Sequence, residues 1–190
     1  MNRAVEDWLP RHRVTVHEYY RMGELGLFAP DARTELIEGA IIDVAAIGSR
    51  HASTVANLTK LLVRAVGDAA TVLVQLPVRL SDYSEPQPDL AIVRPRADRY
   101  AASHPAAADA LLVIEVSMTT WRYDRQIKIP LYARHGVPEV WLIDLNNDQV
   151  HFFRSPHDGD YADVSSTDRP GMTPIASLTG VAIDLSQLFR

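Results

Sequence analysis

Apolar residues recur at helical spacing most clearly in the segment that follows Ser49. There they lie three or four positions apart, at Val55, Leu58, Leu61, Leu62 and Val66. This spacing places one apolar stripe along a helix. We therefore predict a helix that Ser49 caps and that ends at Gly67.

A helix and a hairpin are predicted nearer the N-terminus. The sequence Thr15-Val16-His17-Glu18 has the form of a capping box, in which the Thr hydroxyl and the Glu carboxylate each bind a free backbone N–H. We expect a short helix through about Met22, closed by Gly23. From Thr34 to Ala45, two β-prone runs flank Glu38-Gly39, a pair typical of a tight turn. This pattern predicts a β-hairpin.

Four short apolar runs predict strands. They are Thr71 to Leu80, Asp89 to Val93, Leu111 to Val116 and Glu139 to Asp144. Pro77 indicates an edge or a bulge in the first run. Before the fourth run, Thr120 can cap a helix from about Trp121 to His135, in which Pro130 predicts a kink or a bound water. A strand, a helix and another strand in this order favour a parallel crossover in a mixed sheet.

The C-terminal part predicts short strands at Gln149 to Arg154 and at Gly180 to Leu185, around a loop from Ser155 to Pro174. No internal repeat or low-complexity linker interrupts the chain. We expect one domain over residues 1–190, with residues 1–13 as a flexible N-terminal arm.

Composition narrows the classes of protein and of site. The chain has 190 residues, of which 47% are hydrophobic and 23% charged, a profile typical of one globular domain. No apolar run approaches the roughly 20 residues that span a bilayer, and the N-terminus does not resemble a signal peptide, so we expect a cytoplasmic protein. Cysteine is absent, so oxygen or imidazole ligands must hold any metal, which favours Mg²⁺ or Mn²⁺. The net charge of -5 argues against a broad basic surface for nucleic acid, although a local basic groove remains open.

Two carboxylates at strand ends indicate a functional site. Asp89 follows Pro88 at the start of a short apolar strand, and Glu115 ends the apolar run from Leu111. A carboxylate beside a core strand is unfavourable unless it is paired, protonated or bound to a metal. If the two strands pair, both side chains can bind one cation. Lys128, on the next helix, could orient a water or stabilise charge on a phosphoryl oxygen.

Several segments together resemble one family. They are Gln87-Pro88-Asp89, Ile114-Glu115-Val116-Ser117, Asp124 to Lys128, Glu35 to Gly39, the approach to His51, and Tyr132 to Asp144. The chain resembles the Uma2 family, within the PD-(D/E)XK nuclease superfamily, over roughly Val14 to Asp144. The resemblance implies an α/β fold with a restriction-endonuclease-like mixed β-sheet flanked by helices, to which an N-terminal helix and a β-hairpin are added. It also implies catalytic roles for Asp89, Glu115 and Lys128, with Asp89 and Glu115 as metal ligands.

One departure from the superfamily concerns its basic residue. Ser117 occupies the position where the superfamily usually has Lys, and the resemblance implies that Lys128 has taken over that role.

The surrounding residues leave alternatives open. Glu35 is either a third acidic ligand or a Glu on an exposed strand, and His51 either supports the site or is a surface residue of a first helical turn. Asp124 is expected to orient Lys128, and the alternative is a solvated pair at i,i+4 spacing. Arg122 and Arg125 are candidates for binding nucleic-acid phosphates.

Three functions remain open. The first is a Mg²⁺- or Mn²⁺-dependent endonuclease that hydrolyses phosphodiester bonds of nucleic acid, with DNA the expected substrate. The second is a binding or regulatory protein that keeps the nuclease fold with little or no turnover, and the third is a hydrolase of small phosphoesters. A homodimer is expected, because duplex cleavage needs two sites and the apolar strands Val150 to Phe153 and Val181 to Leu185 can supply a subunit contact.

Overall fold

A computed structural model describes residues 11–44 and 47–189. Its strands form one six-stranded sheet, in the order β3-β4-β5-β6-β7-β8, and two separate antiparallel pairs, β1-β2 and β9-β10. The helical elements are α1 (Val16–Glu24), α2 (Ser49–Val66), η2 (Gly67–Ala69), η3 (Ala107–Asp109), α3 (Trp121–Tyr123), η4 (Asp124–Lys128) and α4 (Ile129–Arg134). The strands are β1 (Thr34–Ile37), β2 (Ala40–Asp43), β3 (Thr71–Val74), β4 (Leu90–Val93), β5 (Ala110–Ser117), β6 (Glu139–Asp144), β7 (Gln149–His157), β8 (Asp160–Thr167), β9 (Met172–Pro174) and β10 (Ala182–Asp184).

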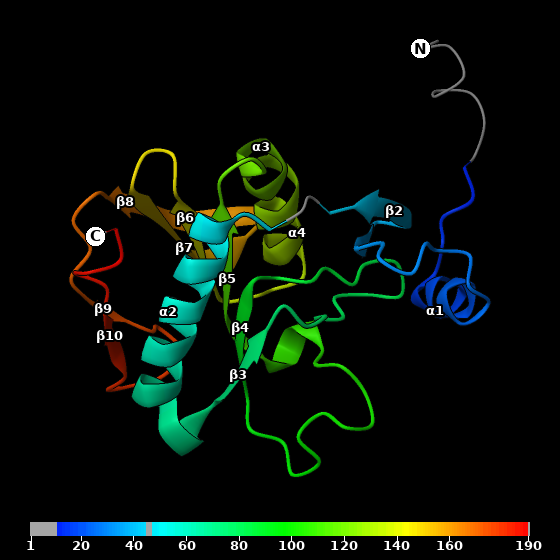
Figure 1. Cartoon of the computed structure of the whole chain (residues 1–190). Helices are drawn as coiled ribbons and strands as arrows, with labels where there is room; N and C mark the ends of the chain where they lie inside the picture. The colour runs from blue at the N-terminus through cyan, green and yellow to red at the C-terminus, as the bar shows by residue number, and fades with distance from the viewer. Residues whose placement is uncertain (1–10, 45–46, 190) are drawn as a thin grey trace.

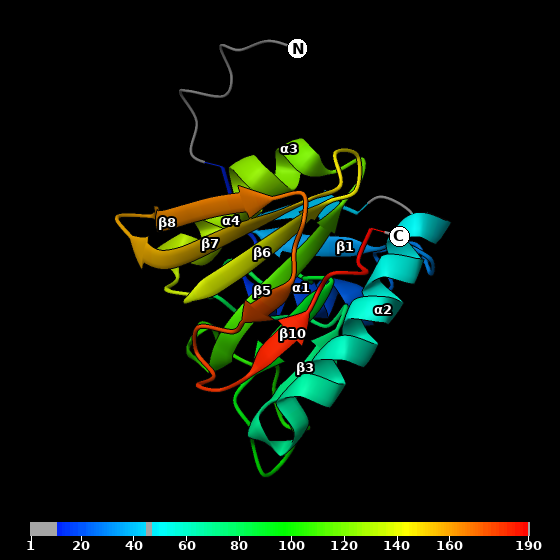
Figure 2. The same ribbon diagram turned by 90° about the vertical axis from the view of Figure 1, so that its left-hand side faces the viewer.

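The predicted mixed sheet flanked by helices is confirmed. Strands β5 and β6 are parallel, and every other neighbouring pair in the six-stranded sheet is antiparallel. Figure 1 shows α2 and the β9-β10 pair on one side of the molecule and α1 with the β1-β2 hairpin on the other. In Figure 2 the strands from β5 to β8 lie side by side, with β8 at the edge.

Side-chain alternation along the strands divides the core between the two faces of the sheet. On one face, Leu112 and Ile114 of β5 pack with the apolar stripe of α2 and with the C-terminal segment. On the other face, Val113 of β5 packs with Leu131 and Tyr132 of α4. This second face also carries the candidate site residue Glu115, because Glu115 lies two positions after Val113 on β5 and its side chain points to the same face.

The N-terminal predictions agree with the structure in most details. Thr15 caps α1 in a capping box with Glu18, although the helix continues one residue past Gly23. Glu38 and Gly39 both have positive φ, at 51° and 83°, as a tight hairpin turn between β1 and β2 requires. Residues 1–10 of the expected arm, and Ala45 at the end of the expected hairpin, lie outside the described residues.

Two predicted boundaries were wrong. Gly48 rather than Ser49 is the N-cap residue of α2. The strand expected to reach Leu80 ends at Val74, because Gln75 has a φ of 51° and turns the chain out of the sheet before Pro77.

The segment expected as a loop from Ser155 to Pro174 contains the end of β7 and the strands β8 and β9. Asp158 and Gly159 form a tight turn with φ of 49° and 81°, so β8 folds back onto β7. Most side chains of β8 are exposed, so no apolar pattern marked this strand.

Several apolar residues of the tail strands, which were expected to supply a subunit contact, pack inside the chain. Val150, Phe153, Ile183 and Leu185 are all buried within the chain. Dimer formation therefore stays a prediction, without the support of these residues. Among the residues that the structure describes, no helix has both the length and the apolar character needed to cross a membrane.

Candidate functional site

Pairing of β4 with β5 brings Asp89 and Glu115 together. Leu90 and Ile114 are opposite one another in this antiparallel pair, so the position before Leu90 lies opposite the position after Ile114. Residues that are opposite in such a pair point to the same face of the sheet. Asp89 and Glu115 therefore line the same cavity, on the face that α4 covers.

Asp89 is held at the edge of this cavity by three donors. Its Oδ2 accepts a hydrogen bond from the backbone N–H of Val116 at 2.9 Å and lies 3.0 Å from Nε2 of His51. Its Oδ1 accepts from Nε2 of Gln75 at 3.2 Å. Burial alone would raise the pKa of Asp89, but His51, the Val116 N–H and the charge of Lys128 outweigh it and lower the pKa. Asp89 is therefore ionised at neutral pH.

His51 lies in the first turn of α2 and faces Asp89. The hydrogen bond to Asp89 raises the pKa of His51, against the effect of burial. The other ring nitrogen, Nδ1, is buried and has no hydrogen-bond partner in residues 11–44 and 47–189. The alternative that His51 is only a surface residue is wrong, since its side chain is 15% exposed.

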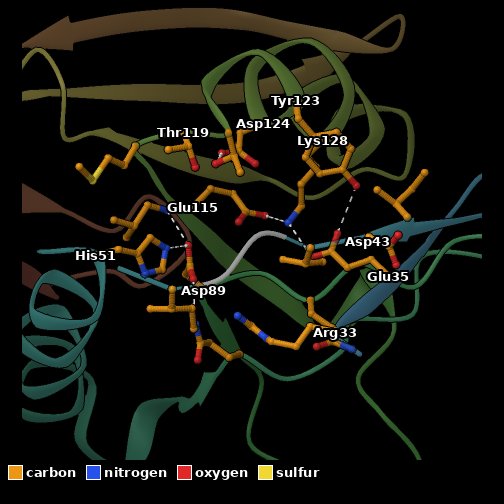
Figure 3. A pocket seen from close by; sticks show the side chains of 18 of the residues that line it. Arg33, Glu35, Asp43, His51, Asp89, Glu115, Thr119, Tyr123, Asp124 and Lys128 are labelled. Carbon is orange, nitrogen blue, oxygen red and sulfur yellow. Dashed lines mark hydrogen bonds and ion pairs between the residues drawn. The ribbon is translucent and has the colours of Figure 1, made fainter. Parts of the chain in front are cut away.

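Glu115 and Lys128 form a buried ion pair at the bottom of the cavity (Figure 3). Lys128 Nζ lies 2.7 Å from Oε1 of Glu115 and 3.2 Å from Oε1 of Glu35. Tyr132 donates its hydroxyl proton to the same Oε1 of Glu115 at 2.6 Å. Glu35 also accepts from the Tyr123 hydroxyl at 3.3 Å and is buried, so the exposed-strand alternative for Glu35 is wrong.

The charges of this pair respond differently to burial. Burial raises the pKa of Glu115 to about 8, because Lys128 offsets the desolvation only in part and the neighbouring carboxylates of Asp124, Asp89 and Glu35 raise it further. Burial opposes the charge of Lys128, but Glu115, Tyr132 and Glu35 together raise the pKa of Lys128 well above its usual value. Lys128 therefore keeps its proton, while Glu115 takes up a proton more readily than a free Glu.

A π-helical turn, η4, positions Lys128. The N–H of Ile129 donates to the carbonyl of Asp124, five residues back, and Pro130 follows with no N–H to donate. The kink predicted at Pro130 is thus a wider helical turn. Both Asp124 and Lys128 point inward and are buried, so a solvated pair is excluded.

Asp124 does not bind Lys128 directly. Its Oδ2 accepts from the Thr120 hydroxyl at 2.6 Å, and within the described residues no ion pair joins it to Lys128. Burial raises the pKa of Asp124, although the charge of Lys128 lowers it. The influence of Asp124 on Lys128 is therefore electrostatic rather than a direct contact.

These side chains line a cavity of about 510 Å³. Its walls come from the β1-β2 hairpin, the start of α2, the segment before β4, the end of β5 and the turn η4. The lining includes five carboxylates, those of Glu35, Asp43, Asp89, Glu115 and Asp124. The permanent cations in the lining are Arg33 and Lys128. The cavity is therefore rich in negative charge.

The donor chemistry of the cavity fits a small divalent cation. Asp89 and Glu115 supply hard oxygen ligands, and both contacts of Glu115 with Lys128 and Tyr132 use Oε1 rather than Oε2. Within the described part of the chain, no group of three or more Asp, Glu and His side chains is arranged to hold a metal. Mg²⁺ commonly binds one or two carboxylates and keeps several waters, so two carboxylates are sufficient.

Two predicted residues lie elsewhere. Arg122 and Arg125 do not line the cavity. The guanidinium of Arg125 lies 4.9 Å from the centre of the Phe153 ring, and Arg122 is exposed. Ser117, at the usual Lys position, is buried within 3.4 Å of the Thr120 hydroxyl.

Other residues of the site were missed from the sequence. Tyr132 lies four positions after Lys128, a spacing that could have placed both on one helical face. Gln75 gave no signal, because its contact with Asp89 depends on the turn after β3.

Comparison with known proteins agrees with this architecture. A family model named Uma2, described as "Putative restriction endonuclease", matches residues 16–186. A crystal structure from Anabaena variabilis, of a "putative nuclease belonging to DUF820", superposes with a TM-score of 0.68 at 19% identity, over 93% of this chain and 97% of that chain. At that identity the likeness shows a shared fold. No curated protein matches the chain.

Proposed function

This chain belongs to the Uma2 family, and we propose that it is a divalent-metal-dependent nuclease that hydrolyses phosphodiester bonds of nucleic acid. The observation that carries the proposal is the cluster of Asp89, Glu115 and Lys128 in one cavity. Carboxylates and an ammonium group are costly to bury, and such groups cluster at functional sites. The restriction-endonuclease-like fold alone does not establish an activity.

In this proposal Asp89 and Glu115 would hold Mg²⁺ or Mn²⁺, and Glu35 is a candidate third ligand. When bound, such a cation supplies Lewis-acid polarisation of the phosphoryl group and lowers the pKa of a bound water. Lys128 contributes a fixed positive charge, which stabilises the negative charge that develops on phosphoryl oxygens. Tyr132 and His51 fix the orientation of the two carboxylates through their contacts with Glu115 and Asp89.

A cation would also relieve the electrostatic strain of the cavity. Burial, together with the neighbouring carboxylates, raises the pKa of Glu115, so its ionised form is disfavoured without further positive charge. A divalent cation beside Asp89 and Glu115 favours both ionised forms. Binding should therefore be coupled to the release of a proton from Glu115 when the pH lies below its pKa of about 8.

The test is cleavage of labelled oligonucleotides by the purified full chain. Single-stranded, duplex and structured DNA and RNA are incubated with Mn²⁺ or Mg²⁺, and in parallel with EDTA. We expect cleavage that EDTA abolishes and that Glu115→Gln lowers by at least about 100-fold, as removal of a transition-state interaction does. Glu24→Gln is the matched control, since Glu24 is an exposed residue of α1 outside the cavity.

A nuclease-fold binding protein is the second candidate. The observation that favours it is the pairing of Lys128 with both Glu115 and Glu35, which occupies the ammonium group within the chain. This candidate predicts binding of nucleic acid without cleavage under every cation tested. Cleavage that disappears in Glu115→Gln but persists in Glu24→Gln would exclude it.

A further inference from the structure

The charged groups of the site lie deep in the cavity. The side chains of Lys128 and Glu115 are 3% and 4% exposed, whereas those of Asp89 and His51, at 14% and 15%, are nearer the surface. A phosphate that contacts Lys128 must therefore enter the cavity, and its sugar and base must follow. A cavity of about 510 Å³ has the size of a small-ligand pocket, with room for one nucleotide and not for a stacked duplex.

Exposed apolar side chains lie where the cavity meets the surface. Ile47, before α2, and Met118, after β5, line the cavity and are each 40% exposed. Large apolar side chains at a cavity mouth are suited to contact the flat faces of unstacked bases, and Met adapts its shape to different bases. Inside a duplex these faces are covered by neighbouring bases, so an unpaired strand offers many more of them to Ile47 and Met118.

The charge of the cavity favours the same class of substrate. Among the described residues that line it, five carboxylates face Arg33 and Lys128 as the permanent cations, and Arg122 and Arg125 lie outside it. Duplex DNA carries one charge per roughly 1.7 Å of its axis, about twice the density of one strand. A duplex is therefore repelled more strongly than a single strand.

Resting on the proposed nuclease function, we propose that the cavity binds an unpaired nucleotide, as found in a single strand, a flap or a frayed end, in preference to an intact duplex. A duplex must first extrude a nucleotide and lose its pairing and stacking, a cost that a single strand does not have. The shared chemistry is an unpaired nucleotide with its phosphate, whether it comes from DNA or RNA.

Binding without a divalent cation tests the inference separately from catalysis. Fluorescence anisotropy in EDTA at low salt compares labelled single-stranded DNA and RNA with a blunt duplex of the same sequence. We expect the full chain to bind single strands at least about tenfold more tightly than the duplex. Equal or tighter binding of the duplex, or no binding of either, would overturn the inference.

Two matched variants locate the binding surface. Met118→Asp is expected to weaken single-strand binding by about fivefold or more, because it removes an apolar contact and adds a negative charge at the mouth. Met172→Asp adds the same charge at a Met that is 69% exposed on β9 and outside the cavity, and should change binding less than about twofold. Equal effects of the two variants would show that net charge, rather than the cavity mouth, governs binding.

Cleavage with Mn²⁺ separates this inference from the proposed function. Flapped and single-stranded substrates should be cut faster than the blunt duplex, with cuts in the unpaired part. Faster cutting of the duplex would preserve the nuclease and overturn the inference. Absence of all cleavage, together with single-strand binding that depends on Met118, would preserve the inference and overturn the nuclease.

Discussion

Replacing Lys128 by Met should destabilise the protein, and more so at high pH. The ammonium group of Lys128 is the permanent positive charge next to Glu115, at 2.7 Å, and both side chains are almost completely buried. Met has a similar length and no charge, so the substitution removes the ion pair while it keeps most of the packing. The buried carboxylates of Glu115 and Glu35 then lose their partner.

The magnitude follows from the burial of the pair. Removing one partner of a buried ion pair costs about 3–5 kcal/mol, a large part of the roughly 5–15 kcal/mol that stabilises a typical domain. Part of this cost can be avoided if Glu115 is protonated. This relief is greater at lower pH, because burial raises the folded pKa of Glu115 from the usual 4.5 to about 8.

The sign of the pH dependence is fixed by that raised pKa. A carboxyl group whose pKa is higher in the folded than in the unfolded state stabilises the fold at low pH. For Glu115 in the wild type this stabilisation is complete below about pH 4.5 and is lost as the pH rises to about 8. Lys128 lowers the pKa of Glu115, so in Lys128→Met the pKa is higher still and stability continues to fall above pH 8. Above pH 8 the variant should lose about 1.4 kcal/mol of stability per pH unit that the wild type does not lose. The cost of the substitution should therefore be larger near pH 9 than near pH 6.

Urea denaturation, followed by circular dichroism at the two pH values, measures the effect. Lys60→Met is the matched control, because Lys60 is an exposed residue of α2, and it should change stability by less than about 0.5 kcal/mol at either pH. The double variant Lys128→Met with Glu115→Gln cannot ionise position 115 and should lose the extra pH dependence. An identical cost of Lys128→Met at both pH values, or a pH dependence that survives in the double variant, would show that ionisation of Glu115 does not govern this stability.

Three further outcomes are expected. Mg²⁺ or Mn²⁺ should raise the Tm of the wild type, by an amount equivalent to about 2.7 kcal/mol at a cation concentration of 100 times Kd. Asp89→Asn and Glu115→Gln should each abolish this rise in Tm, and an unchanged rise would contradict the metal assignment. Tyr132→Phe should cost about 1.5–3 kcal/mol in urea denaturation, because Glu115 loses a hydrogen bond of 2.6 Å, and a cost near zero would show that this contact is unimportant. Replacing Arg122 and Arg125 together by Ala should weaken oligonucleotide binding and reduce its salt dependence by about one to two phosphate contacts, while the Tm rise with Mg²⁺ stays intact.

Local sequence rules were sufficient where an element is defined by its own residues. The capping box at Thr15, the turn at Glu38-Gly39 and the apolar stripe of α2 each depend on contacts within a few positions. The same holds for the buried strands β5 and β6, whose continuous apolar runs are explicit in the sequence. Strand β8 escaped notice because its stability comes from pairing with β7, not from an apolar pattern of its own.

The candidate site divides in the same way. Asp89, Glu115 and Lys128 could be singled out from the sequence, because carboxylates beside apolar runs and the family motif are local features. Their contacts depend on the fold, which brings distant segments together. Lys128 reaches Glu115 through the π-helical turn before Pro130, and Glu35 meets Lys128 from 93 positions away through the fold of the hairpin. Ionisation depends on burial and on charges from distant segments, so the raised pKa of Glu115 could be derived only once those segments were packed together.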